Sequence, residues 1–201
     1  MIKRNLLVMG LAVLLSACGF QLRGTGTYQL TIKELDVSAR DAYGPTVVQL
    51  TDALKGGGVN VHQGAEYKLI LVSEGETSRA ASYNGSARSA EYELTDTVNY
   101  EIRGSRSLLL LEDKAQVQKI YVQDSNNLMG SDQEAQQIRK EMRVQLVQNI
   151  LVRLQQLTPE QLDKLQSNAE AKAKAEADAL EAAQRIENET PRQSPIEIPA
   201  K

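Results

Sequence analysis

One stretch decides the fold of this chain: Glu91-Tyr92-Glu93-Leu94-Thr95-Asp96-Thr97-Val98-Asn99-Tyr100-Glu101-Ile102-Arg103. Tyrosine and aliphatic side chains occupy every second position, interrupted only by Asp96, and every position between them is polar. Alternation with this period predicts a long β-strand with one buried face and one wet face. The Gly104-Ser105 pair that follows predicts a tight reversal, after which residues 106–123 return as the next strand.

The residues before this stretch predict a helix set among further strands. Residues 28–37 alternate in hydrophobicity and predict a first strand. Pro45 suits the first turn of a helix, apolar residues then recur at helical spacing, and the glycines at 56–58 end the helix. A short strand is expected at residues 59–62, and a longer one runs from Tyr67 toward Arg79.

The residues after the central strands predict a long helix and a tail. Ser131-Asp132-Gln133-Glu134 matches a capping box, in which the serine and the glutamate each satisfy one free backbone amide. We expect this helix and the one starting at Pro45 to cover the apolar face of the sheet, which gives a two-layer α+β sandwich. Thr158-Pro159 predicts another helix start, and residues 159–201 are interpreted as a tail that is first helical and then disordered. Apolar residues of the long helix recur at four-residue steps: Ile138, Met142, Leu146, Ile150 and Leu154.

The N-terminus has the pattern of an export signal. Lys3 and Arg4 precede an apolar run that ends at Leu15-Ser16-Ala17-Cys18. A basic start, an apolar segment of about 7–15 residues and a small-residue cleavage site are typical of a secretory signal; a membrane span would need about 20 apolar residues. Cys18 at the cleavage point resembles the bacterial lipobox, in which residues 1–17 are removed and the cysteine receives an N-acyl group and an S-diacylglycerol lipid. The alternative is a chance cysteine beside an ordinary cleavage site.

Composition argues against several classes of function. The formal charge of −3 leaves no basic surface typical of a nucleic-acid binder. Cys18 is the only cysteine and His62 the only histidine, which excludes an intrachain disulfide, a Cys/His dyad and a multi-histidine zinc site. Glu91 and Glu93 are paired carboxylates, as in glycosidases, but they belong to a polar strand face. We therefore expect no enzyme, no metal, and no cofactor apart from the lipid on Cys18.

Three motifs occur in order along the chain. They are Cys18-Gly19-Phe20-Gln21-Leu22-Arg23-Gly24 after the lipobox, Ala90-Glu91-Tyr92-Glu93-Leu94 on the central strand, and Asn127-Leu128-Met129-Gly130-Ser131 followed by Glu141-Met142-Arg143. Together they resemble the LPS-assembly lipoprotein family LptE, also called RlpB, over residues 1–157. Each motif alone is weak, and the specificity lies in their order and spacing.

This resemblance implies an outer-membrane lipoprotein, lipid-anchored on the periplasmic side, with two helices on a four-stranded sheet. It implies a 1:1 complex in which the protein plugs the β-barrel LptD and assists its folding. It also implies that the protein binds lipopolysaccharide and helps to deliver it to the outer leaflet. The corresponding division is a signal peptide (1–17), a lipidated linker (18–27), an α/β domain (28–158) and the tail (159–201). The alternatives are a lipoprotein adaptor or binding module of another cell-envelope complex and, third, an enzyme acting on glycans or lipids.

Lipopolysaccharide carries phosphates, so arginines at strand ends are candidate contacts through charge-assisted hydrogen bonds. Arg79 and Arg88 flank the loop at one end of the predicted strands, and Arg103 and Arg106 flank the turn at the other. We expect Arg79 and Arg88 to be the main contacts; the alternative is that they are ordinary surface arginines. Residues 129–134, between strand and helix, are a candidate contact with the barrel.

Overall fold

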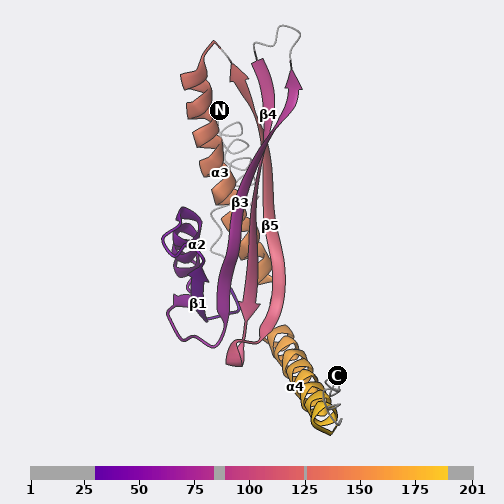
Figure 1. The fold of residues 1–201 in the computed structure, drawn as a ribbon. Helices are drawn as coiled ribbons and strands as arrows, with labels where there is room; N and C mark the ends of the chain where they lie inside the picture. The colour runs from indigo at the N-terminus through magenta and orange to yellow at the C-terminus, as the bar shows by residue number, and fades with distance from the viewer. Residues whose placement is uncertain (1–29, 84–88, 125, 190–201) are drawn as a thin grey trace, which may run out of the picture.

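The computed structural model describes residues 30–83, 89–124 and 126–189. Its centre is a five-stranded sheet in the order β2-β1-β3-β4-β5 (Figure 1). β1 runs parallel to both of its neighbours, whereas β3, β4 and β5 form an antiparallel meander. The three meander strands are the long ones, and at about 3.3 Å per residue they extend roughly 50 Å. The bounds are Glu34–Ala39 for β1, Asn60–Val61 for β2, Lys68–Tyr83 for β3, Ser89–Arg103 for β4 and Leu109–Asp124 for β5.

The alternating stretch forms β4, between β3 and β5, as the sequence predicts. Leu94, Val98 and Ile102 are fully buried, and Tyr100 is 1% exposed. The polar side chains of the opposite phase stay partly or fully exposed. β4 therefore supplies the centre of the core on one face and a polar surface on the other.

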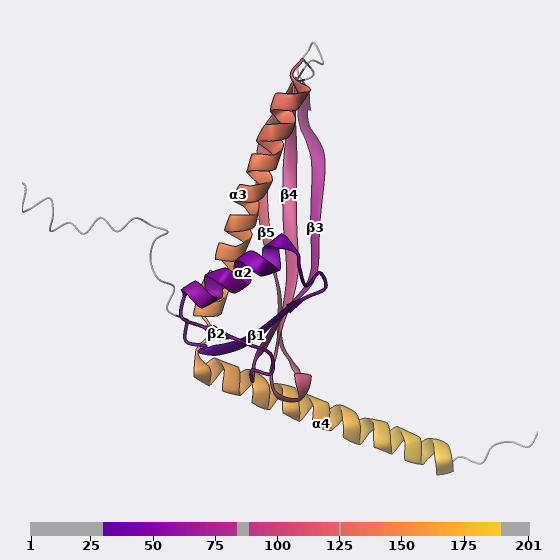
Figure 2. The same ribbon diagram turned by 90° about the vertical axis from the view of Figure 1, so that its left-hand side faces the viewer.

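Helices α2 (Pro45–Gly56) and α3 (Leu128–Gln155) cover one face of this sheet (Figure 2). The predicted stripe of α3 is buried from Met142 onward, with Leu146 and Ile150 also at 0% exposure. Ile138, one step earlier, is only partly buried. The two-layer α+β class is confirmed, and the hydrophobic core lies under the C-terminal half of α3.

The first strand is shorter than its pattern suggests. Leu30 and Ile32 are buried, but residues 30–33 form no strand, and β1 begins at Glu34. An alternating hydrophobic pattern indicates which side chains are buried. A segment can bury those side chains without forming hydrogen bonds to a neighbouring strand, as residues 30–33 do. The short segment expected at residues 59–62 does form β2, so the sheet has five strands, where the resemblance implies four.

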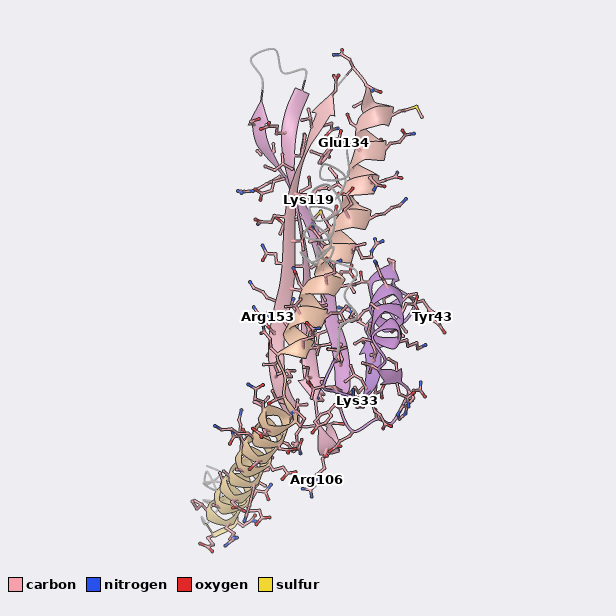
Figure 3. All side chains as sticks on the ribbon, turned by 180° about the vertical axis from the view of Figure 1, so that it is seen from behind. Lys33, Tyr43, Arg106, Lys119, Glu134 and Arg153 are labelled. Atoms are coloured by element: carbon pink, nitrogen blue, oxygen red, sulfur yellow. The ribbon has the colours of Figure 1, made fainter. Side chains whose placement is uncertain are left out.

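The predicted capping box at Ser131 is wrong, because α3 begins one turn earlier. Asn127 is the N-cap, and its Oδ1 accepts a hydrogen bond from the amide of Gly130 at 3.1 Å. The Ser131 hydroxyl accepts from the amide of Asp124 at 2.9 Å and donates to the carbonyl of Asn127 at 3.1 Å. Ser131 thus fastens the end of β5 to the first turn of α3, while Glu134 is exposed (Figure 3).

Helix α4 (Pro159–Glu189) projects from one end of the sheet (Figures 1 and 2). It begins where the sequence predicts: Thr158 Oγ1 accepts from the amide of Gln161, and Gln161 Oε1 accepts from the amide of Thr158. Leu162 is buried against the body, and the following turns are mostly exposed. Among the described residues, no helix has the length and apolar character needed to cross a membrane.

Candidate functional site

The face of the meander that points away from α2 and α3, here called the open face, is polar along its centre and carries exposed apolar side chains only toward one end of β5. Its centre carries neutral side chains in register across the strands, with Thr77 beside Thr95 and Gln118, and Thr97 beside Gln116. Asn99 donates a hydrogen bond to Ser73 Oγ at 2.9 Å in the next row. A sheet face of this kind is suited to water or to another polar wall.

Arg79 lies on the open face and is paired within the protein. Its Nε and Nη2 donate to the two carboxylate oxygens of Glu93, at 2.9 and 3.1 Å. This contact lowers the pKa of the Glu93 carboxyl and raises the pKa of the Arg79 guanidinium. An anion that binds Arg79 must therefore compete with Glu93.

Arg103 and Arg106 lie at the opposite end of the strands, so the candidate arginines do not converge on one site. Arg103 donates to Glu101 Oε2 at 2.8 Å and to the carbonyl of Ser107 at 3.2 Å. Arg106 sits in the 3₁₀ turn Ser105–Ser107, exposed beside α4 (Figure 3). Cys18 and Arg88 lie outside the described residues.

Apolar side chains are exposed at the end of the molecule where β5 passes into α3. Leu128 is 54% and Met129 78% exposed in the first turn of α3. Ile120 and Val122 are also about half exposed, on the open face of β5. The segment 129–134 thus presents an apolar start to a helix whose following residues are mostly polar.

A polar layer lies on the covered face of the sheet, between the N-terminal half of α3 and strands β3 and β4. Asp96 is only 8% exposed and faces Glu76 in register on β3. Burial raises the pKa of the Asp96 carboxyl to about 6, helped by the negative charges of Glu74 and Glu76, with Arg143 acting in the opposite direction. Arg139 donates to both oxygens of Glu76 at 2.9 Å.

This layer is the feature that sequence reasoning missed. The only signal was the position of Asp96 in an otherwise apolar phase. Its partners reach the covered face because β3 contains a register shift between Leu71 and Ser73, which reverses the side-chain alternation. Glu74 and Glu76 then face the helices, where Thr46 of α2 donates to Glu74 at 2.6 Å.

The remaining ionisable residues that the structure describes form no recognisable catalytic group. His62 is exposed, with its Nε2 3.5 Å from Glu34, and the adjacent carbonyl of Gln63 raises its pKa. Glu91 accepts from Ser82 at 2.6 Å, and Glu93 pairs with Arg79, so both carboxylates are engaged on the open face. In the part of the chain that the structure describes, no group of three or more acidic, histidine or cysteine side chains could hold a metal ion.

Comparison with known proteins gives a consistent family. LPS-assembly lipoproteins LptE of Photorhabdus laumondii and Pectobacterium atrosepticum are each 29% identical to this chain, covering 74% of it and 83% of their own length. The fold is similar to that of rare lipoprotein B from Shewanella oneidensis (TM-score 0.53, 21% identity, 71% of this chain and 98% of that one). A minor lipoprotein from Acinetobacter baumannii is also similar (TM-score 0.54, 18% identity, 63% and 92%).

The family model described as LptE, lipopolysaccharide-assembly, matches residues 32–154. These residues run from just before β1 to the last turn of α3, and thus comprise the whole sheet and both covering helices. The chain belongs to the LptE family of lipopolysaccharide-assembly proteins.

Proposed function

We propose that this protein is a lipoprotein of the outer membrane, lipidated on Cys18 and facing the periplasm, that plugs the lumen of the LptD β-barrel in a 1:1 complex. In this role it is not an enzyme: it assists assembly of the barrel, binds lipopolysaccharide and takes part in delivering it to the outer leaflet. Family membership and the names of the relatives support the assembly role. The observation that carries the plug is the open face.

The open face has the chemistry that a plug needs. The interior of an outer-membrane barrel is polar, and a long sheet face that stays uncovered is stable against such a wall only if it is polar too. The central rows of Thr77, Thr95, Thr97, Gln116 and Gln118 offer uncharged hydrogen-bonding groups, which lose less hydration energy than charges when they leave water.

A plug is surrounded by its barrel, whereas a docked adaptor touches its partner on one side. This difference can be tested with a photo-crosslinking residue placed at Thr97 on the open face or at Gln145 on the exposed side of α3, with Asp178 on α4 as the control. We expect adducts with one large barrel protein from both Thr97 and Gln145. Adducts from one side only, or with a different envelope protein, would support the adaptor alternative and contradict the plug.

The lipid on Cys18 acts in this proposal as a tether that brings the protein to the correct membrane. Two or more acyl chains are enough for stable anchoring, while the polar body makes the contacts with the barrel. A variant with a cleavable signal and Cys18→Ala should therefore still form the complex when it is co-expressed with the barrel. Loss of the complex would make the lipid part of the interface.

Lipopolysaccharide binding by Arg79, Arg88, Arg103 and Arg106 is proposed on the basis of charge. Arg79 would exchange Glu93 for a phosphate, and Arg103 would exchange Glu101, whereas Arg106 has no such competitor among the described residues. Reversing the charges of Arg79 and Arg88 together should weaken binding of lipopolysaccharide to the purified soluble domain without changing its circular dichroism. Unaltered binding would remove these two residues from the proposed site.

A further inference from the structure

We propose that the β4–β5 turn and the first half of α4 form a notch that binds a phosphate monoester group, held by Arg106, Lys174 and Ser167. A cavity of about 590 Å³ lies between these residues, a size within the usual range for small-ligand pockets. All three views place the turn beside α4, and Figure 3 shows Arg106 there. The notch would add a phosphate contact to the proposed binding of lipopolysaccharide. That its natural ligand is lipopolysaccharide rests on the proposed function.

The two cations of the notch are unpaired among the described residues, unlike Arg79 and Arg103. Within the described residues neither Arg106 nor Lys174 makes an ion pair or a side-chain hydrogen bond, whereas Arg79 and Arg103 each bind a glutamate. An arginine can bind two phosphate oxygens with its planar fork, and a lysine can bind a third as a point charge. Ser167 adds a neutral donor on the same lining.

Glu170 is the one acidic residue of the lining, and it sets the balance of charge. Its Oε1 accepts a hydrogen bond from Gln166 Nε2 at 2.8 Å, which turns part of the carboxylate toward its own helix. Two cations against one carboxylate leave one positive charge in the notch. A phosphate monoester, with a charge between −1.5 and −2 at neutral pH, complements it.

The backbone at Arg106 points to a role for its side chain. Arg106 has φ 58° and ψ 22°, and Ser107 also has φ 58°. Among the described residues they are the only non-glycine residues in the left-handed region, which costs free energy for any residue with a Cβ. Glycine would relieve this cost, so an arginine here is explained best by what its guanidinium binds.

The turn is also held closely against α4, which keeps the notch in shape. A Cβ at Gly104 would meet the side-chain ends of Gln166 and Leu110, so the turn packs directly against α4 and a larger residue there would have to displace the Gln166 side chain. Lys174 and Ser167 lie beyond residues 32–154, the part of the chain that matches the family model. The notch therefore joins the β4–β5 turn, which lies within the residues that match the family model, to α4, which lies outside them.

The experiment is an NMR titration of the full chain, without its signal, with inorganic phosphate, followed at the backbone amide resonances of Ser107 and Ser167, which are present in every variant. We expect weak saturable binding, with a dissociation constant on the order of millimolar. Arg106→Gly should weaken it about tenfold, which corresponds to about 1.4 kcal/mol, while thermal stability stays the same or rises. Lys174→Gln should weaken binding, Glu170→Gln should strengthen it, and Lys172→Gln, outside the lining and paired with Glu176, should change nothing.

A second titration identifies the source of the phosphate. Vesicles of phosphatidylcholine with phosphatidic acid present the monoester on a lipid, and vesicles of phosphatidylcholine alone are the control. Binding that depends on Arg106 in both titrations, or with the vesicles alone, supports a lipid-borne phosphate; binding of inorganic phosphate alone supports a small phosphorylated ligand. If Arg106→Gly leaves both titrations unchanged, the proposal that the notch binds phosphate is wrong. The barrel adducts from Thr97 and Gln145 do not involve the notch, so they test the proposed function separately.

Discussion

Replacing Asp96 by asparagine should stabilise the protein at neutral pH. Asp96 is 8% exposed, and burial raises the pKa of its carboxyl to about 6 in the folded protein, compared with an ordinary value of 3.8. Between these two pH values the folded protein binds a proton that the unfolded chain has released. The free energy of unfolding of the wild-type protein therefore falls as the pH rises from about 4 to about 6 through this residue.

The size of the effect follows from the displaced pKa. A pKa raised from 3.8 to about 6 sets a ceiling of about 3 kcal/mol, at 1.36 kcal/mol for each pH unit. Some solvent still reaches Asp96, and the positive charge of Arg143 favours the ionised form, so we expect about half of this ceiling. Asp96→Asn should then gain about 1.5 kcal/mol at pH 7.5 and almost nothing at pH 4.5.

Urea unfolding of both proteins from pH 4.5 to 7.5, followed by circular dichroism, measures this difference. Asp178→Asn is a matched control, because Asp178 is an exposed acid on α4. If Asp96→Asn instead destabilises the protein at pH 7.5, the carboxylate is held in a favourable ion pair with Arg143. The argument from burial would then be refuted.

Three further predictions concern packing, capping and the open face. Met142→Ala removes a fully buried side chain and should cost about 2–4 kcal/mol in urea unfolding, whereas Met129→Ala, at a 78% exposed position, should cost almost nothing; similar losses would contradict the position of the core. Asn127→Ala should cost about 1 kcal/mol by removing the N-cap of α3, and Glu134→Ala should have little effect; a comparable loss from Glu134→Ala would reinstate the capping box. The pKa of Glu93, measured by NMR, should lie below its ordinary value in the wild-type protein and rise in Arg79→Gln, so the stabilising contact is present at neutral pH and is lost as the pH falls through that lowered value. An identical Glu93 titration in both proteins would show that the pair does not form in solution.

The parts of the fold that the sequence predicted are those in which one residue pattern has one structural outcome. The phase of β4 and the four-residue steps of α3 both became buried faces, because a regular period places side chains on one side of a strand or helix. The pattern was less reliable at element ends. There the start of α3 depended on Asn127 rather than on the equally plausible Ser131, and both are good capping residues.

The polar contacts were harder to predict because they depend on register. Read without an interruption, β3 would place Arg79 in phase with Leu69 and Leu71, toward the helices. The register shift after Leu71 reverses the alternation, so Arg79 meets Glu93 on the open face while Glu76 faces Asp96. The notch at Arg106 was beyond prediction for a different reason, since nothing in the local sequence indicates that the first half of α4 passes beside the turn.

The division of α3 into two halves has a consequence for local unfolding. Its C-terminal half is anchored by the core residues from Met142 to Leu154, while the side chains of Arg139 and Glu141 in its N-terminal half form ion pairs with Glu76 and Lys119 on the sheet. Hydrogen bonds and ion pairs that water can replace hold a segment less firmly than buried apolar surface does. Amide exchange should therefore be graded along α3, faster in the turn around Gln136 and Gln137 and slow near Ile150, so that one end of the molecule can adjust its shape while the other stays folded.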